Sequence, residues 1–133
     1  EVADFAIPLC ATIHLSGSTI TLTTCSLAVI LLAGHAFPSL AAYFPFIMML
    51  GITMVAAPGV PGGAVMAALG ILQSMLGFTE AQLGLMIALY LTQDSFGTAC
   101  NVTGDCAISI IVDTLAGNGH RREKLAQSPA AAR

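Results

Sequence analysis

Three long apolar blocks, separated by short stretches rich in glycine, proline and hydroxyl residues, occupy most of the chain. They cover residues 5–34, 38–77 and 82–116. An α-helix rises about 1.5 Å per residue, and about 20 apolar residues cross the hydrocarbon core of a bilayer. The first and third blocks are therefore each long enough for one tilted membrane-spanning helix. The pattern predicts an all-α, polytopic membrane protein.

The first block has a polar interruption at its middle, His14-Leu15-Ser16-Gly17-Ser18-Thr19. One interpretation is a regular packed helix, in which hydroxyl groups bond back to their own carbonyls and Gly17 admits a neighbouring helix. The other is a transmembrane helix that unwinds near Ser16 and Gly17 to line a site. The pattern leaves both interpretations open.

The second block is divided by Ala57-Pro58-Gly59-Val60-Pro61-Gly62-Gly63. Proline lacks a backbone donor and glycine is costly in a helix, so two short helices are predicted, at 40–57 and 63–77. The connection carries no charge and no Asn, Asp or Ser to hold it among the headgroups. This favours a re-entrant hairpin whose tip stops inside the membrane. A tight turn between two short full spans is the alternative.

The third block, expected to form a final long transmembrane helix, places carboxylates inside an apolar segment. At about 100° per residue, Thr98, Asn101 and Asp105 lie at about +40°, −20° and +20° relative to Asp94, so one face holds all four. Charged groups in a membrane segment are costly unless they are paired or hydrated. No Lys or Arg precedes position 121. We expect a bound cation, a cationic substrate group or a proton to neutralise the carboxylates, unless a basic residue beyond this sequence does so.

Composition strengthens the membrane assignment. Of 133 residues, 56% are hydrophobic and 8% are charged, against roughly 25% charged in a soluble domain. The net charge of −3 leaves no basic surface for nucleic acid. All four Lys and Arg residues lie within 121–133, so the positive-inside tendency places the C-terminus in the cytoplasm. Residues 117–133 are predicted to form a disordered cytoplasmic tail.

The chain begins directly in apolar sequence, with neither an initiating Met nor a basic leader. We expect it to be a fragment without a signal peptide. Its four cysteines form no C-x-x-C pair, and we expect them to be small buried hydrophobes, not a disulfide framework.

Three motifs occur in the order typical of one transporter family: Pro8-Leu9-Cys10-Ala11-Thr12-Ile13-His14-Leu15-Ser16-Gly17-Ser18, then Pro58-Gly59-Val60-Pro61-Gly62-Gly63, then Asp94 followed by Asn101-Val102-Thr103-Gly104-Asp105. With them the chain resembles the dicarboxylate/amino acid:cation symporters, which include the bacterial glutamate transporters. The resemblance implies that 1–116 is the C-terminal part of the transport domain, with the seventh helix at 5–34, the second re-entrant hairpin at 38–77 and the eighth helix at 82–116. It also implies cation (Na⁺)-coupled secondary active symport, a multi-pass protein of the cell inner (plasma) membrane, and a homotrimer when full length.

The resemblance further implies a substrate site and two sodium sites, and sodium is a hard cation suited by oxygen ligands. Asp94 would hold the substrate amino group, and Val60 belongs to the lid. The substrate contacts would be Ser18, Val60, Asp94, Thr98 and Asn101; one sodium site would use the carbonyls of Cys10, His14 and Asn101 with the carboxylate of Asp105; the second would use the carbonyls of Thr12 and Leu15 with Met54, Val55 and Ala57.

Two departures from the family change the expected chemistry. The family's arginine, which pairs with a substrate side-chain carboxylate, falls on Gly97, so we expect a neutral or small amino acid in place of glutamate. The Asn and Asp of the family's unwound motif fall on His14 and Ser16, so a third sodium site is lost and fewer sodium ions per cycle are expected. His14 could serve as a protonatable coupler, with H⁺ as a second ion, or could hydrogen-bond across helices.

Other function classes stay open beside the symporter. A helical membrane module that only packs through Ser, Thr and Gly would show no cation dependence of its stability. An intramembrane enzyme is the third class, but the chain contains no G-x-S-x-G, H-E-x-x-H or phosphate-loop motif. We therefore expect a protein that is not an enzyme, with membrane lipid and a small-molecule amino acid or dicarboxylate as its partners.

Overall fold

The computed structural model describes the backbone of residues 2–126 and the side chains of residues 3–116. Its elements within that range are all helices: α1 Val2–Ile13, α2 Ser16–Leu32, α3 Leu40–Val55, α4 Gly63–Leu76 and α5 Glu80–Ala126. Two stretches, Ala3–Leu32 and Glu80–Ala116, are long and apolar enough to cross a membrane. The predicted all-α class is confirmed.

Local signals at the helix ends agree with the sequence. The Ser39 hydroxyl accepts a hydrogen bond from the Ala42 amide at 3.3 Å and caps the start of α3. Gly62 precedes α4 and Gly77 follows it, with φ of 74° and 68°. An L-residue with a side chain is strained in this left-handed region, so glycine is required at both ends of the helix.

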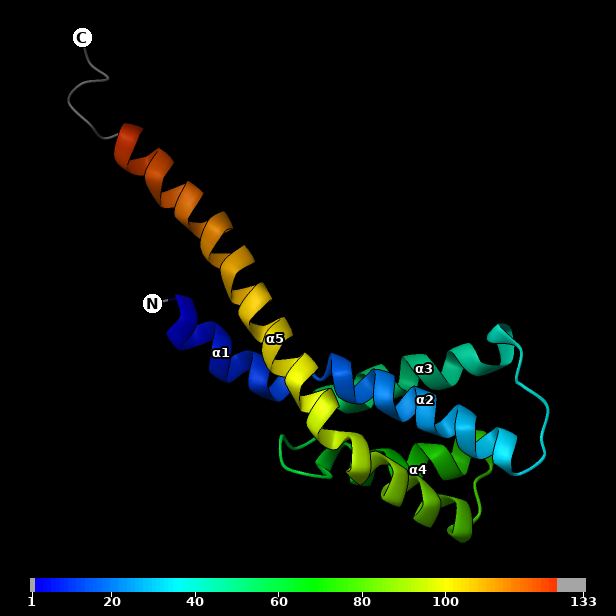
Figure 1. Ribbon diagram of the computed structural model, residues 1–133. Helices are drawn as coiled ribbons and strands as arrows, with labels where there is room; N and C mark the ends of the chain where they lie inside the picture. The colour runs from blue at the N-terminus through cyan, green and yellow to red at the C-terminus, as the bar shows by residue number, and fades with distance from the viewer. Residues whose placement is uncertain (1, 127–133) are drawn as a thin grey trace.

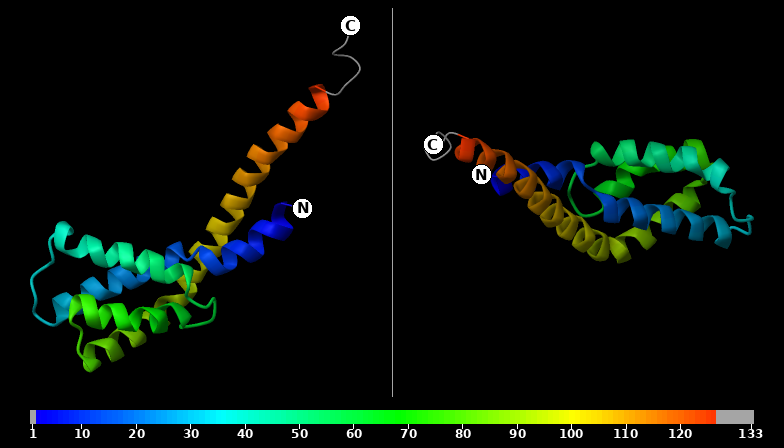
Figure 2. Two further views of the ribbon diagram at one scale, coloured as in Figure 1. Left: turned by 180° about the vertical axis from the view of Figure 1, so that it is seen from behind. Right: turned by 90° about the horizontal axis from the view of Figure 1, so that it is seen from above.

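The helices form a layered bundle around the first part of α5 (Figures 1 and 2). α3 and α4 make an antiparallel hairpin, and α2 packs along both this hairpin and α5. α1 continues the direction of α2 past the break and lies against a later part of α5. The C-terminal part of α5 extends beyond the other helices in every view.

The buried core lies between α2, the hairpin and the first turns of α5. Its largest fully buried side chains include Leu22, Phe46, Leu72 and Tyr90. Many large apolar side chains on the outer faces are exposed instead, such as Phe96 at 75%. Such a surface fits a lipid environment better than water.

The first predicted interruption is a real break, but it lies earlier than expected. The chain leaves helical geometry at His14 and Leu15, while Ser16 and Gly17 already form the first turn of α2. The first N–H groups of a helix have no partner within the helix. At the start of α2 the Gly17 N–H finds one outside it, since it donates to Asn101 Oδ1 at 2.8 Å. The regular, uninterrupted helix is excluded.

α3 ends at Val55 and α4 at Leu76, against expected helix ends at 57 and 77. α5 begins at Glu80 and runs past the expected helix end at 116 to Ala126; residues 127–133 of the predicted tail lie outside the described residues. All four cysteines are free, but only Cys10 and Cys25 are buried. The expectation of burial is wrong for Cys100 and Cys106, which lie on exposed faces of α5.

Candidate substrate and cation site

A cavity of about 260 Å³ lies where the break, the hairpin tip and α5 meet. α1 and α2 contribute the residues around the break, and the connection between α3 and α4 covers one side. α5 contributes a polar face. The lining comprises Ala11, His14, Leu15, Ser18, Pro58, Gly59, Val60, Pro61, Ala64, Tyr90, Asp94, Thr98, Asn101, Val102 and Asp105.

The side-chain amide of Asn101 clamps the beginning of α2 onto α5. Its Oδ1 accepts from the Gly17 backbone N–H at 2.8 Å, and its Nδ2 donates to Ser18 Oγ at 3.1 Å. Asn101 is 7% exposed, so both bonds form in a largely dry setting, where an unpaired amide would be costly. This one side chain fixes the broken segment relative to the cavity.

Gly17 permits this close approach of α2 to α5. A Cβ atom on Gly17 would lie 2.3 Å from the carbonyl oxygen of Gly97 and 2.8 Å from Cys100 Cβ. A Cβ on Gly97 would meet Thr21 Oγ1 at 3.4 Å, which is an ordinary contact. Position 97 therefore faces α2, and it is not among the residues that line the cavity. Small residues let the two backbones touch, as is common between membrane helices.

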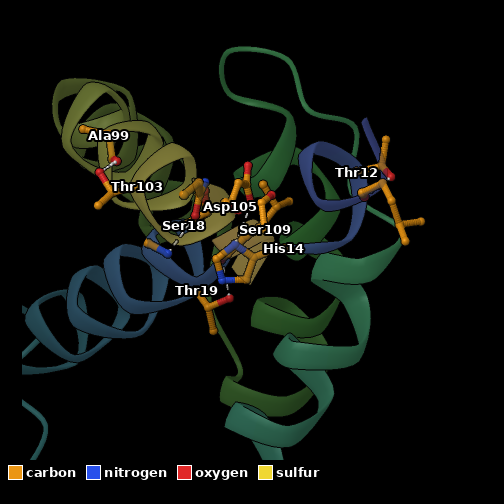
Figure 3. A network of polar contacts seen from close by, with 12 residues as sticks. Thr12, His14, Ser18, Thr19, Ala99, Thr103, Asp105 and Ser109 are labelled. Carbon is orange, nitrogen blue, oxygen red and sulfur yellow. Dashed lines mark hydrogen bonds and ion pairs between the residues drawn. The ribbon is translucent and has the colours of Figure 1, made fainter. Parts of the chain in front are cut away.

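His14 and Asp105 form a pair across the break. His14 Nδ1 and Asp105 Oδ1 are 2.8 Å apart, and the two side chains point toward one another in Figure 3. Since an ionised carboxylate only accepts, the ring N–H donates. The imidazole rests on Gly104, where a Cβ would lie 2.3 Å from His14 Cε1. The structure thus shows the cross-helix hydrogen bond that the sequence allowed; a proton-coupling role for His14 stays a prediction.

Asp94 connects α5 to the hairpin tip. Its Oδ2 accepts from the Gly62 backbone N–H at 3.1 Å. The buried Tyr90 lines the same cavity as Asp94 and Ser18. Among the residues whose side chains the structure describes, no Lys or Arg lines the cavity. Within the described part of the chain, the carboxylate therefore lies at the cavity with a neutral backbone donor, Gly62 N–H, and without a cationic side chain.

The structure brings many of the predicted site residues together. All five predicted substrate contacts line the cavity, as do three of the predicted cation residues that are not also substrate contacts. The lining members are Ser18, Val60, Asp94, Thr98 and Asn101, with His14, Leu15 and Asp105.

The remaining predicted residues lie outside the cavity. The Thr12 hydroxyl donates to the Leu9 carbonyl on the exposed side of α1, apart from the His14–Asp105 pair (Figure 3). Cys10, Met54 and Ala57 are buried, and Val55 is exposed. Of the residues predicted for the second sodium site, only Leu15 lines this cavity; the site itself stays a prediction.

The carbonyl groups proposed as cation ligands differ in their availability. The Leu15 carbonyl accepts from both the backbone N–H and the hydroxyl of Thr19, at 2.9 and 2.8 Å, which uses both of its lone pairs. The Cys10 carbonyl accepts from the His14 N–H at 2.8 Å. The described residues contain no group of three or more His, Cys, Asp or Glu side chains that could hold a metal. A cation here would depend on Asp105 together with backbone oxygens.

Sequence reasoning missed Tyr90, Gly62 and Gly104. Tyr90 lies four residues before Asp94, and the same 100° rule that aligned the polar residues puts it on their face. The sequence marks Gly62 as a helix breaker and as part of the motif at the tip, but it does not indicate that the Gly62 N–H donates to Asp94. No local pattern indicates that Gly104 makes room for His14, because this role depends on where the ring of His14 lies.

Comparison with known proteins agrees with this geometry. Residues 1–115 match the Sodium:dicarboxylate symporter family. The chain belongs to this family of membrane transporters, and the resemblance inferred from the motifs is confirmed. Membership supports sodium-coupled symport of dicarboxylates or amino acids in general terms. Neither the curated proteins nor the solved structures contain a match.

Proposed function

We propose that this chain is the C-terminal part of the transport domain of a sodium-coupled symporter that carries a neutral or small amino acid. The observation that supports this most directly is the placement of Asp94. Its carboxylate lies at the cavity beside the hairpin tip, and none of the described side chains that line this space is Lys or Arg. A substrate ammonium group would supply the missing positive charge, with Thr98 and Asn101 as further polar contacts.

The same cavity disfavours a second carboxylate on the substrate. A dicarboxylate or glutamate side chain would enter a site without a basic partner, and an unpaired buried charge is strongly destabilising. Gly97, where relatives are expected to carry arginine, faces α2 and contributes no side chain. The volume of about 260 Å³ also falls below the roughly 300–1,000 Å³ of pockets for larger ligands. Charge and size both favour a small neutral amino acid.

Sodium is the coupling ion in this proposal and is carried as a substrate. The end of the cavity at His14, Asn101 and Asp105 supplies the negative oxygen that a hard cation needs. Backbone carbonyls at the end of α1 add the negative end of a helix dipole. Cation binding there would order the break, and substrate binding at Asp94 would let the hairpin tip close over Val60.

The membrane arrangement follows from the family and the two apolar stretches. We propose that α3 and α4 form a re-entrant hairpin, that the C-terminus is cytoplasmic, and that the complete protein is a homotrimer of the plasma membrane. Labelling at Val60 from each side of the membrane distinguishes a re-entrant tip from a turn between two full spans. A tip that is freely labelled in the aqueous phase in all conditions would contradict the hairpin.

The test is uptake by the complete protein in liposomes, with a panel of amino acids and dicarboxylates and with NaCl or choline chloride outside. We expect sodium-dependent accumulation of small neutral amino acids, and little competition from aspartate or succinate. Tight dicarboxylate binding would contradict the substrate assignment. If no substrate is taken up and the melting temperature does not depend on sodium, the helical membrane module that only packs would be favoured instead.

A further inference from the structure

The start of α4 depends on an acceptor from another helix. Gly62, which precedes α4, is buried, and as a glycine it has no side chain to cap the helix. Its backbone N–H donates to Asp94 Oδ2 of α5 at 3.1 Å. In a capping box, a side chain from the first turn of the same helix accepts from this N–H. Here Asp94, a residue of a different helix, takes that place.

The connection before α4 is folded on itself. The Val60 N–H donates to the Pro58 carbonyl at 2.9 Å, and the Gly63 N–H donates to the Val60 carbonyl at 2.8 Å. A Cβ on Gly63 would lie 2.3 Å from the Pro58 carbonyl oxygen. These contacts maintain the shape of the connection but do not attach it to α5. The bond from Gly62 to Asp94 does attach it.

The Asp94 carboxylate can hold the tip and a second group at the same time. It has two oxygens and about four lone-pair sites, and Gly62 uses one site on Oδ2. Asp94 also lines the cavity, so a cationic group in the cavity can bind at the sites that remain. The two partners need different properties of the side chain. A backbone N–H needs an acceptor oxygen, whereas an ammonium group needs the negative charge.

We propose that Asp94 is the latch of the hairpin tip, residues 57–63, as well as a substrate contact. The donor and the acceptor of this latch both belong to the chain, so the bond between Gly62 and Asp94 forms without substrate or cation. Only the link to substrate rests on the proposed function, which assigns the substrate amine to Asp94. A single carboxylate then joins the amine to the tip.

Labelling of a cysteine at position 64 measures whether the tip is latched. Ala64 lies in the first turn of α4, lines the cavity and is 4% exposed. The reporter Ala64→Cys is made in the complete protein, with the exposed Cys100 and Cys106 replaced by Ala. Its rate of reaction with a maleimide is measured in choline chloride without amino acid. The native Cys25, 2% exposed in the core, is read in the same samples and reports opening of the whole bundle.

Three substitutions in the reporter protein separate the acceptor from the charge. We expect Asp94→Ala to speed labelling at position 64 by about tenfold, as for the loss of one hydrogen bond to a charged acceptor, while Cys25 stays protected. We expect Asp94→Asn, which keeps an acceptor oxygen, to speed labelling by about threefold or less. Asp113→Ala removes an exposed carboxylate of the same helix outside the cavity and should have no effect.

Each result decides a different point. Labelling that is no faster in Asp94→Ala than in Asp113→Ala contradicts the latch, and so does an Asp94→Asn protein that opens as far as Asp94→Ala. If Asp94→Ala exposes Cys25 as well, hydrogen exchange in the unsubstituted protein decides. A protected Gly62 amide supports the latch, and exchange at the rate of an open chain contradicts it. An intact latch in a protein that takes up no amino acid contradicts the proposed function alone.

Discussion

The two ends of α2 use the same pair of residues for different purposes. At one end Ser26 meets Tyr43, and their hydroxyls close on each other and on the Thr23 carbonyl among apolar side chains. At the other end Ser18 and Tyr90 both line a cavity, together with Asp94 and Asn101 of α5, and Ser18 Oγ accepts from Asn101 Nδ2. A serine and a tyrosine alone satisfy one another and hold helices together. With a carboxylate and a broken helix beside them, the same pair becomes part of a site.

The largest expected effect comes from removing the charge at the cavity end. Asp94→Asn should lower the affinity for neutral amino acids by about 100-fold or more, because the substrate ammonium group loses its charged partner. The measurement is sodium-dependent uptake or binding by the complete protein. Asp113→Asn is the control, since this carboxylate is exposed on the same helix outside the cavity. Equal losses in both variants would contradict the role of Asp94.

The next prediction concerns the close contact between Gly17 of α2 and Gly97 of α5, beside the cavity. Gly17→Ala should destabilise the fold by about 1–3 kcal/mol, as in other overpacked sites, because the added Cβ would lie 2.3 Å from the Gly97 carbonyl oxygen. Gly70→Ala, with open space around the new methyl, should be neutral or slightly stabilising, since alanine favours helix. Thermal unfolding of both variants makes the comparison; a harmless Gly17→Ala would mean that α2 and α5 do not touch there.

A smaller effect is expected at the His14–Asp105 pair. Gly104→Ala places a methyl group where the imidazole rests, so His14 must move and its bond to Asp105 weakens. We expect a loss of about 1 kcal/mol, the usual size for one hydrogen bond. Gly84→Ala lies on the same helix with nothing near the new methyl and serves as the control. The readout is again the melting temperature, and indistinguishable variants would show that the ring does not rest on Gly104.

The comparison also shows what a sequence can and cannot reveal. The shared face of Asp94, Thr98, Asn101 and Asp105 could be predicted, because a helix repeats its geometry regardless of its neighbours. The two short helices of the hairpin followed from proline and glycine for a similarly local reason.

Features that depend on contact between helices were not accessible in this way. The position of the break depends on which amide Asn101 reaches, and the value of Gly104 depends on the ring of His14. Backbone ligands were implied by resemblance alone, and no side-chain pattern reports whether a carbonyl such as that of Leu15 is already engaged. Packing between segments that are distant in the sequence decides the position of the break and the contacts of these groups. The sequence of a single segment does not contain that information.

The most direct measurement is the melting temperature of the purified complete protein, titrated with NaCl against choline chloride at constant ionic strength, for the wild type and for Asp105→Asn. A ligand that binds only the folded state raises apparent stability by mass action, by about 2.7 kcal/mol at 100 times its Kd. We predict a rise with sodium in the wild type that is greatly reduced in Asp105→Asn. A wild type that melts at the same temperature in both salts, or a variant that responds as strongly as the wild type, would contradict a cation site at the broken end of α2.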